Sequence, residues 1–213
     1  MPAGHITDPF SNVNYKKQNN FRRRKMLEAK LVAITGGMFV GKSTELIAVG
    51  EKYKRAGYHV LYVKPKIDSR YSEDHIVTHN GEKVQALSTE YRYDMLNSWE
   101  YIYFDSADVI LIDEIQFFTE AIVEELEYWI NQGKLIYVAG LDLDYNAKPF
   151  YVTSQVMAIA DEVHKRKTVC NMCSNPSYVS LKRSGSSERI ELGSSDIYSA
   201  VCRECYNKEQ ERY

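Results

Sequence analysis

The sequence predicts an α/β fold in which a mostly parallel sheet is flanked by helices, with a small metal-binding subdomain at the C-terminal end. Three observations support this prediction. Apolar runs of strand length alternate with helical patterns between residues 30 and 140, as expected for βαβ units. A glycine-rich segment joins the first predicted strand to the first predicted helix. Four cysteines, arranged in two pairs, all follow residue 169.

The first part of the predicted sheet starts with KLVAITGG, residues 30–37, which we expect to form a buried strand that runs into glycines. Residues 43–57 follow as an amphipathic helix, with Gly57 at its C-cap. Residues 58–65 form a second strand that stops at Pro65. The buried face of the helix is expected to contain Leu46, Ile47, Gly50, Tyr53 and Ala56.

The second part of the sheet repeats this alternation. Residues 108–113, DVILID, predict a strand, and residues 134–140, KLIYVAG, predict another. Residues 119–133 between them have helical periodicity, with Thr119 placed to cap the helix and Gly133 placed to end it. The apolar stripe of this helix is expected to contain Ile122, Leu126, Trp129 and Ile130.

The composition indicates a globular protein that works in the cytoplasm. Of the 213 residues, 44% are hydrophobic and 26% are charged, which is ordinary for such proteins. No apolar run approaches the length of a membrane span, and the N-terminus has no apolar core of a secretory signal. The formal net charge is −2, which does not indicate a general nucleic-acid binder.

Three segments differ in character. Residues 1–29 show no periodicity, and their first 25 residues hold six basic residues against one acidic residue, Asp8. We expect a flexible basic extension there, in preference to a nucleic-acid-binding arm. Residues 30–167 should form the main nucleotide-binding domain. Residues 168–213 contain short polar segments, turn residues and the cysteine pairs, and should form the small subdomain.

The segment GGMFVGKS, residues 36–43, fits the phosphate-binding pattern G-x-x-x-x-G-K-[ST], between a strand and a helix. Its backbone N–H groups and the helix N-terminus should face the phosphates of ATP. Lys42 should reach the β and γ phosphates, and Ser43 should offer its hydroxyl to Mg²⁺. The fold is therefore expected to be a P-loop fold of the RecA-like type. The remaining loop residues expected at the nucleotide are Gly36, Gly37, Met38, Phe39, Val40 and Gly41.

Two carboxylates follow the apolar strand VILI, in the segment VILIDEIQFF. Asp113 stands where a P-loop protein holds Mg²⁺ or its water shell. Glu114 comes next, and the pattern alone leaves open whether it activates a water that hydrolyses ATP or a hydroxyl that receives a phosphate.

The cysteines occur as CNMC and CREC, and each pair has the C-x₂-C spacing of a zinc site. Four thiolates leave no open position for a catalytic water, so the zinc should be structural. It would hold both ends of the polar segment 174–201. The predicted ligands are Cys170, Cys173, Cys202 and Cys205.

Taken together, these motifs resemble the cellular-type thymidine kinases, a family with a P-loop and zinc. The resemblance covers residues 31 to about 206. It rests on GGMFVGKSTEL, KPKIDSRYS, VTHN, LIDEIQFF, AGLDLDYNAKPF, DIYSAVC and the two cysteine pairs, which occur in the order and spacing of the family.

The resemblance implies transfer of the γ-phosphate of ATP to the 5′-hydroxyl of thymidine, and of deoxyuridine as well. It implies that Glu114 is the general base and that Arg70 offsets charge or orients Glu114. It also implies a homotetramer that dTTP, the end product, inhibits. Beyond the P-loop and Asp113, the residues implied at the nucleotide are Asp68, Ser69, Arg70, Glu114, Ile115 and Gln116.

For the nucleoside, the resemblance implies a pocket closed by a lasso-like loop between the cysteine pairs. Phe117 and Tyr145 would contact the base, while Met38 and Leu141 would line the pocket. The other implied contacts are Ser180, Arg189, Ile190, Glu191, Leu192, Gly193 and Tyr198.

Several residues depart from the family pattern, among them Ser180 and Lys182, which stand where threonine and arginine are usual. Gly37 replaces a usual proline, Val40 replaces a small residue, and Ser194 lies where a glycine is usual. Ile115 replaces glycine or alanine, and the sequence does not explain what makes room for it. None of these changes removes a catalytic group.

Two other functions fit parts of the pattern. In a different RecA-like P-loop ATPase that acts on nucleic acid, Glu114 would activate water, but the zinc-bearing segment would then have no obvious role. In a zinc-ribbon protein that binds nucleic acid through the basic arm, Lys42 would be dispensable. The sequence favours the kinase over both.

Overall fold

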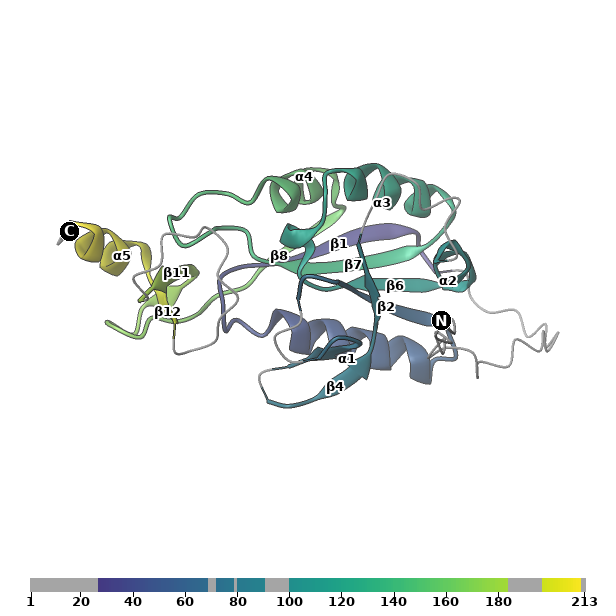
Figure 1. The fold of residues 1–213 in the computed structure, drawn as a ribbon, viewed down its shortest axis with the longest axis horizontal. Helices are drawn as coiled ribbons and strands as arrows, with labels where there is room; N and C mark the ends of the chain where they lie inside the picture. Colours follow the sequence, from purple (N-terminus) through teal and green to yellow (C-terminus); the bar gives the residue numbers. More distant parts are fainter. Residues whose placement is uncertain (1–26, 69–71, 79, 91–99, 184–196, 212–213) are drawn as a thin grey trace, which may run out of the picture.

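The computed structural model describes residues 27–68, 72–78, 80–90, 100–183 and 197–211. Its centre is a six-stranded sheet in which all pairings are parallel, with the strand order β5-β2-β6-β7-β1-β8 (Figure 1). The predicted α/β class is therefore confirmed. The strands are β1 (Lys30–Thr35), β2 (Val60–Pro65), β5 (Leu87–Thr89), β6 (Val109–Ile112), β7 (Leu135–Gly140) and β8 (Glu162–Lys165).

Helices cover both faces of the sheet (Figure 1). Helix α1 (Lys42–Arg55) lies on one face, and α3 (Ala121–Asn131) and α4 (Tyr151–Ile159) lie on the other. The alternation within β6 matches this, because Val109 and Leu111 join the cluster under α1 while Ile110 and Ile112 join the cluster under α3 and α4. A strand that is buried on both faces must be apolar throughout, which explains VILI.

The sequence placed the main strands and helices correctly, with small errors at their ends. Gly57 and Gly133 both have left-handed backbone conformations after α1 and α3, with φ of 84° and 83°, as expected for helix ends. The N-cap of α3 is Glu120 rather than the predicted Thr119, and the Glu120 side chain makes no capping hydrogen bond. Ala56 is exposed rather than part of the buried face of α1.

Several elements have no counterpart in the sequence prediction. They are β5, β8, α4, the short helix α2 (Tyr101–Ser106) and the antiparallel pair β3 (His75–Val77) and β4 (Lys83–Gln85). Strand β8 has the sequence EVHK and pairs only with β1, so it is an edge strand without an apolar pattern.

Beyond residue 167 the chain forms two small antiparallel pairs and a helix. They are β9 (Thr168–Val169) with β10 (Pro176–Ser177), β11 (Val179–Lys182) with β12 (Tyr198–Val201), and α5 (Arg203–Gln210). Cys170, Val179, Val201, Cys202, Cys205 and Tyr206 form a separate buried cluster there.

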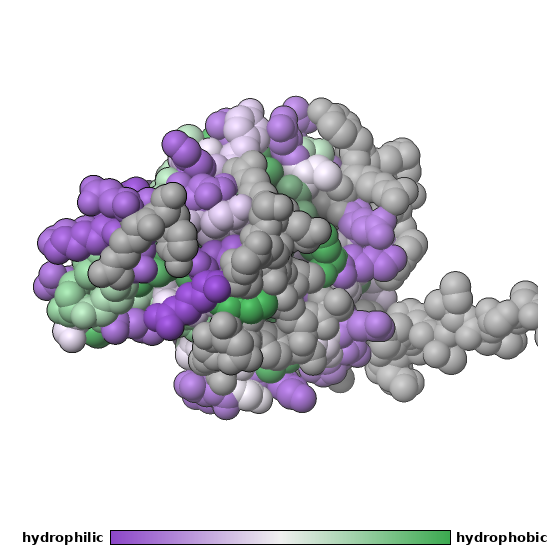
Figure 2. Space-filling view, turned by 60° about the vertical axis from the view of Figure 1, so that its left-hand side comes forward, coloured by the Kyte–Doolittle hydropathy of each residue, from purple (hydrophilic) through white to green (hydrophobic). Residues whose placement is uncertain are grey.

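The surface at this end of the molecule is mainly hydrophilic in the view of Figure 2, with hydrophobic side chains confined to smaller areas. Among the described residues, no helix is long and apolar enough to cross a membrane. The predictions for residues 1–26, Ser69, Arg70, Arg189–Gly193 and Ser194 lie outside the described residues.

Candidate active site and metal centre

The candidate active site lies where three neighbouring strands end. The P-loop follows β1, Asp113 and Glu114 follow β6, and Leu141 follows β7. Because these strands are parallel and adjacent, their carboxyl ends meet at one edge of the sheet. This edge is where open α/β sheets bind their ligands.

The P-loop has a tight backbone path. Gly36 and Gly41 have φ of 138° and 81°, and Phe39 has φ of 63°, which is unusual for a residue with a side chain. Gly36 also lies against a neighbouring segment, since an added Cβ would come within 2.5 Å of the Arg166 carbonyl oxygen. The Lys42 ammonium donates a hydrogen bond of 2.6 Å to the Gly37 carbonyl and so lies over the loop.

The fold brings together Ser43 and Asp113, which are far apart in the sequence. The Ser43 side chain lies beside the buried Asp113 carboxylate and favours its charged form. Burial raises the pKa of Asp113 to about 7, and the neighbouring Glu114 charge adds to this, while Ser43 and Lys42 oppose it. A hydroxyl beside a buried carboxylate is an oxygen donor set that suits Mg²⁺.

Glu114 lies at the N-terminal end of the short 3₁₀ helix η2 (Ile115–Phe117) and has a left-handed conformation with φ of 53°. Its N–H donates to the Asp113 carboxylate at 3.0 Å. The Gln116 side-chain amide donates to the Glu114 carboxylate and accepts the Leu141 N–H at 2.9 Å. Gln116 therefore orients Glu114 and ties η2 to the end of β7.

The structure explains how Ile115 is accommodated. Ile115 is fully buried, and the residue that faces it at the end of β7 is Gly140. A Cβ on Gly140 would lie 2.6 Å from both the Ile115 Cγ2 atom and the Gln116 Oε1 atom. The missing side chain of Gly140 is thus the space that the larger Ile115 fills.

Lys64 is a residue of this edge that sequence reasoning missed. Its ammonium is almost completely buried and donates to the Ser72 carbonyl at 2.6 Å and the His75 carbonyl at 3.2 Å. It also lies 3.8 Å from the Asp68 carboxylate. The Lys64 ammonium therefore links the Asp68 carboxylate to the backbone of Ser72 and His75. Its place at the end of a buried strand was the available signal.

Three of the predicted nucleoside-pocket residues lie in the segments that follow β6 and β7. Phe117 and Leu141 are half-buried beside the carboxylate edge, and Tyr145 lies in the turn that follows β7. The Tyr206 hydroxyl from α5 donates to the Tyr145 carbonyl at 3.0 Å, and the Lys182 ammonium lies 4.7 Å from the centre of the Tyr145 ring. Helix α5 and strand β11 therefore position this aromatic side chain.

Tyr198 and Ser180 lie on the β11–β12 pair. Tyr198 is buried on β12 opposite Lys182. The Ser180 side chain is buried and accepts a hydrogen bond of 3.0 Å from the Met38 N–H of the P-loop. The contact of Ser180 that the structure shows is therefore with the phosphate-binding loop.

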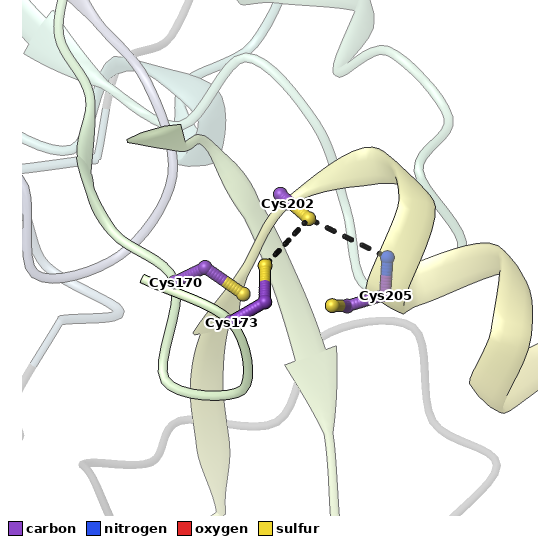
Figure 3. A group of neighbouring side chains, drawn as sticks. All are labelled: Cys170, Cys173, Cys202 and Cys205. Carbon is purple, nitrogen blue, oxygen red and sulfur yellow. Dashed lines mark hydrogen bonds between the residues drawn. The ribbon is translucent and has the colours of Figure 1, made fainter. Parts of the chain in front are cut away.

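The four cysteines converge on one point, with their sulfur atoms within 4.8 Å of one another. Figure 3 shows Cys170 and Cys173 on one loop and Cys202 and Cys205 at the start of α5. The Met172 N–H lies 3.5 Å from the Cys170 sulfur, and the Cys205 N–H lies 3.5 Å from the Cys202 sulfur. Burial raises the pKa of Cys170, but backbone N–H donors outweigh it and lower the pKa to about 6. Thiolates in this arrangement can hold a tetrahedral metal ion.

The fold and these two sites define a P-loop α/β protein with a four-cysteine centre. A family model described as thymidine kinase matches residues 29–206. A curated thymidine kinase of Pseudothermotoga lettingae is 34% identical over 183 residues, which cover 85% of this chain and 97% of that protein. The chain belongs to the thymidine kinase family, whose members are ATP-dependent phosphotransferases.

Solved structures show only distant likeness. The AMPPCP-bound DnaA of Aquifex aeolicus has 17% identity and a TM-score of 0.39, over 63% of this chain and 39% of that chain. The Pif1 helicase of Candida albicans has 13% identity and a TM-score of 0.41, over 65% of this chain and 36% of that chain. The chain spans less than half of either protein, and no functional argument follows from likeness at this level.

Proposed function

We propose that the protein transfers the γ-phosphate of ATP to the 5′-hydroxyl of thymidine. Family membership supports the substrate and the reaction. One structural observation carries the proposal. Glu114 lies directly beside Ser43 and Asp113, at the carboxyl ends of the strands where the P-loop also lies. A carboxylate there can accept a proton from a hydroxyl that attacks a phosphate on the P-loop.

In the proposed reaction, Glu114 is the general base for the 5′-hydroxyl, and Gln116 orients it. Lys42 binds the transferred phosphoryl group, and the loop N–H groups bind the rest of the phosphate chain. Ser43 and Asp113 would hold Mg²⁺, which supplies charge neutralisation when it is bound. Asp68, which Lys64 positions, leads into Ser69 and Arg70, and the resemblance assigns Arg70 to the phosphates.

For the nucleoside, we propose that the base lies among Met38, Phe117, Leu141 and Tyr145. Tyr145 is supported by its two fixed contacts, with α5 and with Lys182. We propose that Tyr198 and the segment 189–193 close over the base, and that deoxyuridine is accepted as well as thymidine. Ser180 was expected to contact the nucleoside, and its hydroxyl accepts a hydrogen bond of 3.0 Å from the Met38 N–H.

We propose that the four cysteines hold structural Zn²⁺, since four convergent thiols leave no position for a substrate. The division into an extension at 1–29, a kinase domain at 30–167 and a zinc-binding part at 168–213 is likewise a proposal. So are a homotetramer, inhibition by dTTP and a cytoplasmic location.

A panel of nucleosides tests the function. The full-length protein is incubated with ATP, Mg²⁺ and each common deoxynucleoside, and phosphorylated nucleoside and ADP are quantified. We expect thymidine and deoxyuridine to yield monophosphates with one ADP per product. ADP release that single-stranded DNA stimulates, without phosphorylated nucleoside, would instead identify an ATPase.

A further inference from the structure

Strand β11 contacts the P-loop at Met38. The Met38 N–H donates to the Ser180 hydroxyl at 3.0 Å. One residue earlier, Gly37 lies against the same segment, because an added Cβ would come within 2.6 Å of the Tyr178 carbonyl oxygen. Two independent contacts, one a hydrogen bond and one a close backbone approach, therefore join residues 37–38 to residues 178–180.

Strand β11 is itself held by its partner strand β12 and lies next to the four cysteines. It pairs with β12, with Ser180 opposite Ala200. Cys170 and Cys173 precede β11 in the chain, and Cys202 and Cys205 follow β12 directly. The Asn171 N–H also donates to the Ala200 carbonyl at 2.9 Å. The group that holds the P-loop thus belongs to the same strand pair that the four-cysteine centre anchors.

The hydrogen bond has a clear physical consequence. Ser180 is only 4% exposed, so water cannot readily replace its hydroxyl if it is removed. The hydrogen bond is partly buried, so a Met38 N–H that loses this partner costs free energy, and the loop would relieve that cost by adopting other conformations. Because only the correct loop conformation binds phosphates, the apparent affinity for a nucleotide falls with the fraction that remains competent.

We propose that Ser180 is a positioning residue for the P-loop, which couples the β11–β12 pair to nucleotide affinity through the Met38 N–H. The inference rests on the proposed binding of ATP at the P-loop. It extends that proposal because Ser180, which was expected to contact the nucleoside, is assigned a role in binding the phosphates of the nucleotide. A contact with thymidine alone would leave ADP affinity unchanged when Ser180 is altered.

The test is calorimetric titration of the full-length protein with ADP and Mg²⁺, together with separate KM values for ATP and thymidine. We expect Ser180→Ala to weaken ADP binding about tenfold and to raise the KM for ATP similarly. Ser180→Thr keeps the hydroxyl and should restore ADP affinity. The matched control is Ser199→Ala, which removes a buried hydroxyl from the partner strand and should leave ADP affinity unchanged.

A second variant keeps the test decisive if Ser180→Ala folds poorly. Gly37→Ala places a methyl group against the Tyr178 carbonyl, so it should displace the loop from β11 and weaken ADP binding too. If both changes act by releasing the P-loop from the segment 178–180, the double variant should lose less affinity than the product of the single losses.

The outcomes separate the two proposals. Wild-type protein that binds no ADP would contradict the proposed function itself. Wild-type binding that Ser180→Ala leaves unchanged, or a rise in the thymidine KM alone, would overturn the positioning role only.

Discussion

The nucleotide edge of the sheet and the four-cysteine region have their geometry maintained in different ways. At the nucleotide edge, the functional loops leave strands that are buried on both faces, such as β1 and β6. In the four-cysteine region, the paired strands are two to four residues long and the buried cluster is small, with cysteines making up half of it. The first region relies on a large apolar core, whereas the second has too little apolar surface and needs its cysteine centre.

Left-handed backbone conformations occur in both regions. The nucleotide edge holds Phe39 and Glu114 in such conformations, which residues with side chains rarely adopt, and Ser174 beside Cys173 has one too, with φ of 61°. Such conformations cost about 1–3 kcal/mol each and persist only where the surroundings enforce them. A rigid parallel sheet can enforce them at Phe39 and Glu114, whereas Ser174 is held by the turn in which its N–H donates to the Cys170 carbonyl at 3.0 Å.

The largest expected effect falls on the nucleotide edge. Glu114→Gln should reduce kcat by roughly 10²–10⁴-fold, because the amide cannot accept the proton of the 5′-hydroxyl. ADP affinity should remain, since the P-loop and Asp113 are unchanged. Steady-state kinetics and ADP titration measure the two effects, with the exposed Glu120→Gln as a control. Near-normal kcat in the Glu114 variant would exclude it as the base.

The second-largest effect is expected when the four-cysteine region loses its metal, because this change should leave the nucleotide edge intact. Removing the metal with a chelator, or replacing Cys173 with serine, should raise the thymidine KM by roughly tenfold or more as the cysteine region loosens. Amide hydrogen exchange should accelerate in residues 168–182 and 198–210, but not in β6 and β7. Met172→Ser, a change at an exposed neighbour, serves as the control. An unchanged KM in metal-free protein would break the proposed link between the metal and nucleoside binding.

Much of both regions was predictable from the sequence, because local pattern determines it. Apolar runs marked the buried strands, the P-loop motif lies between the strand and helix that it requires, and the cysteine spacing indicated one cluster. Strand β8 was missed because an exposed edge strand such as EVHK needs no apolar alternation. Helix α4 was missed because it has neither a capping side chain nor charged residues in its end turns.

The contacts between segments could not be predicted in the same way. Gln116 bonds to the Leu141 N–H, Ser180 bonds to the Met38 N–H, and Lys64 joins Asp68 to Ser72. Each depends on which strands become neighbours, and the strand order of the sheet is not the order of the chain. Ile115 is the clearest case, because the residue that makes room for it, Gly140, belongs to another strand.

This Ile115–Gly140 pair gives a smaller, structural prediction for the core that holds the nucleotide edge. Gly140→Ala should destabilise the protein by about 1–3 kcal/mol, because the new methyl group overlaps Ile115 and Gln116. Adding Ile115→Ala should recover part of that loss, whereas Ile115→Ala alone should leave a cavity and destabilise. Urea unfolding of the three variants measures the coupling. Strictly additive losses would show that the two side chains do not compete for one space.

The smallest effect is expected at a surface pair beside the P-loop, Glu45 on α1 and Arg166 just after β8. The Arg166 guanidinium donates to both oxygens of the Glu45 carboxylate, with the Nε bond at 2.7 Å. Arg166 is 47% exposed, so Arg166→Met, which keeps the side-chain stem, should cost at most about 1 kcal/mol.

High salt should weaken the ion pair between Glu45 and Arg166 but should leave the contacts of the Arg166 backbone unchanged. Its N–H donates to the Thr35 carbonyl at 2.7 Å, and its carbonyl lies against Gly36, and neither contact depends on the side chain. The difference in unfolding free energy between wild type and Arg166→Met should therefore shrink as salt screens the ion pair. A difference that high salt leaves unchanged would mean that the side chain contributes by packing. Arg166 would then hold the P-loop through its stem and backbone, with no contribution from its charge.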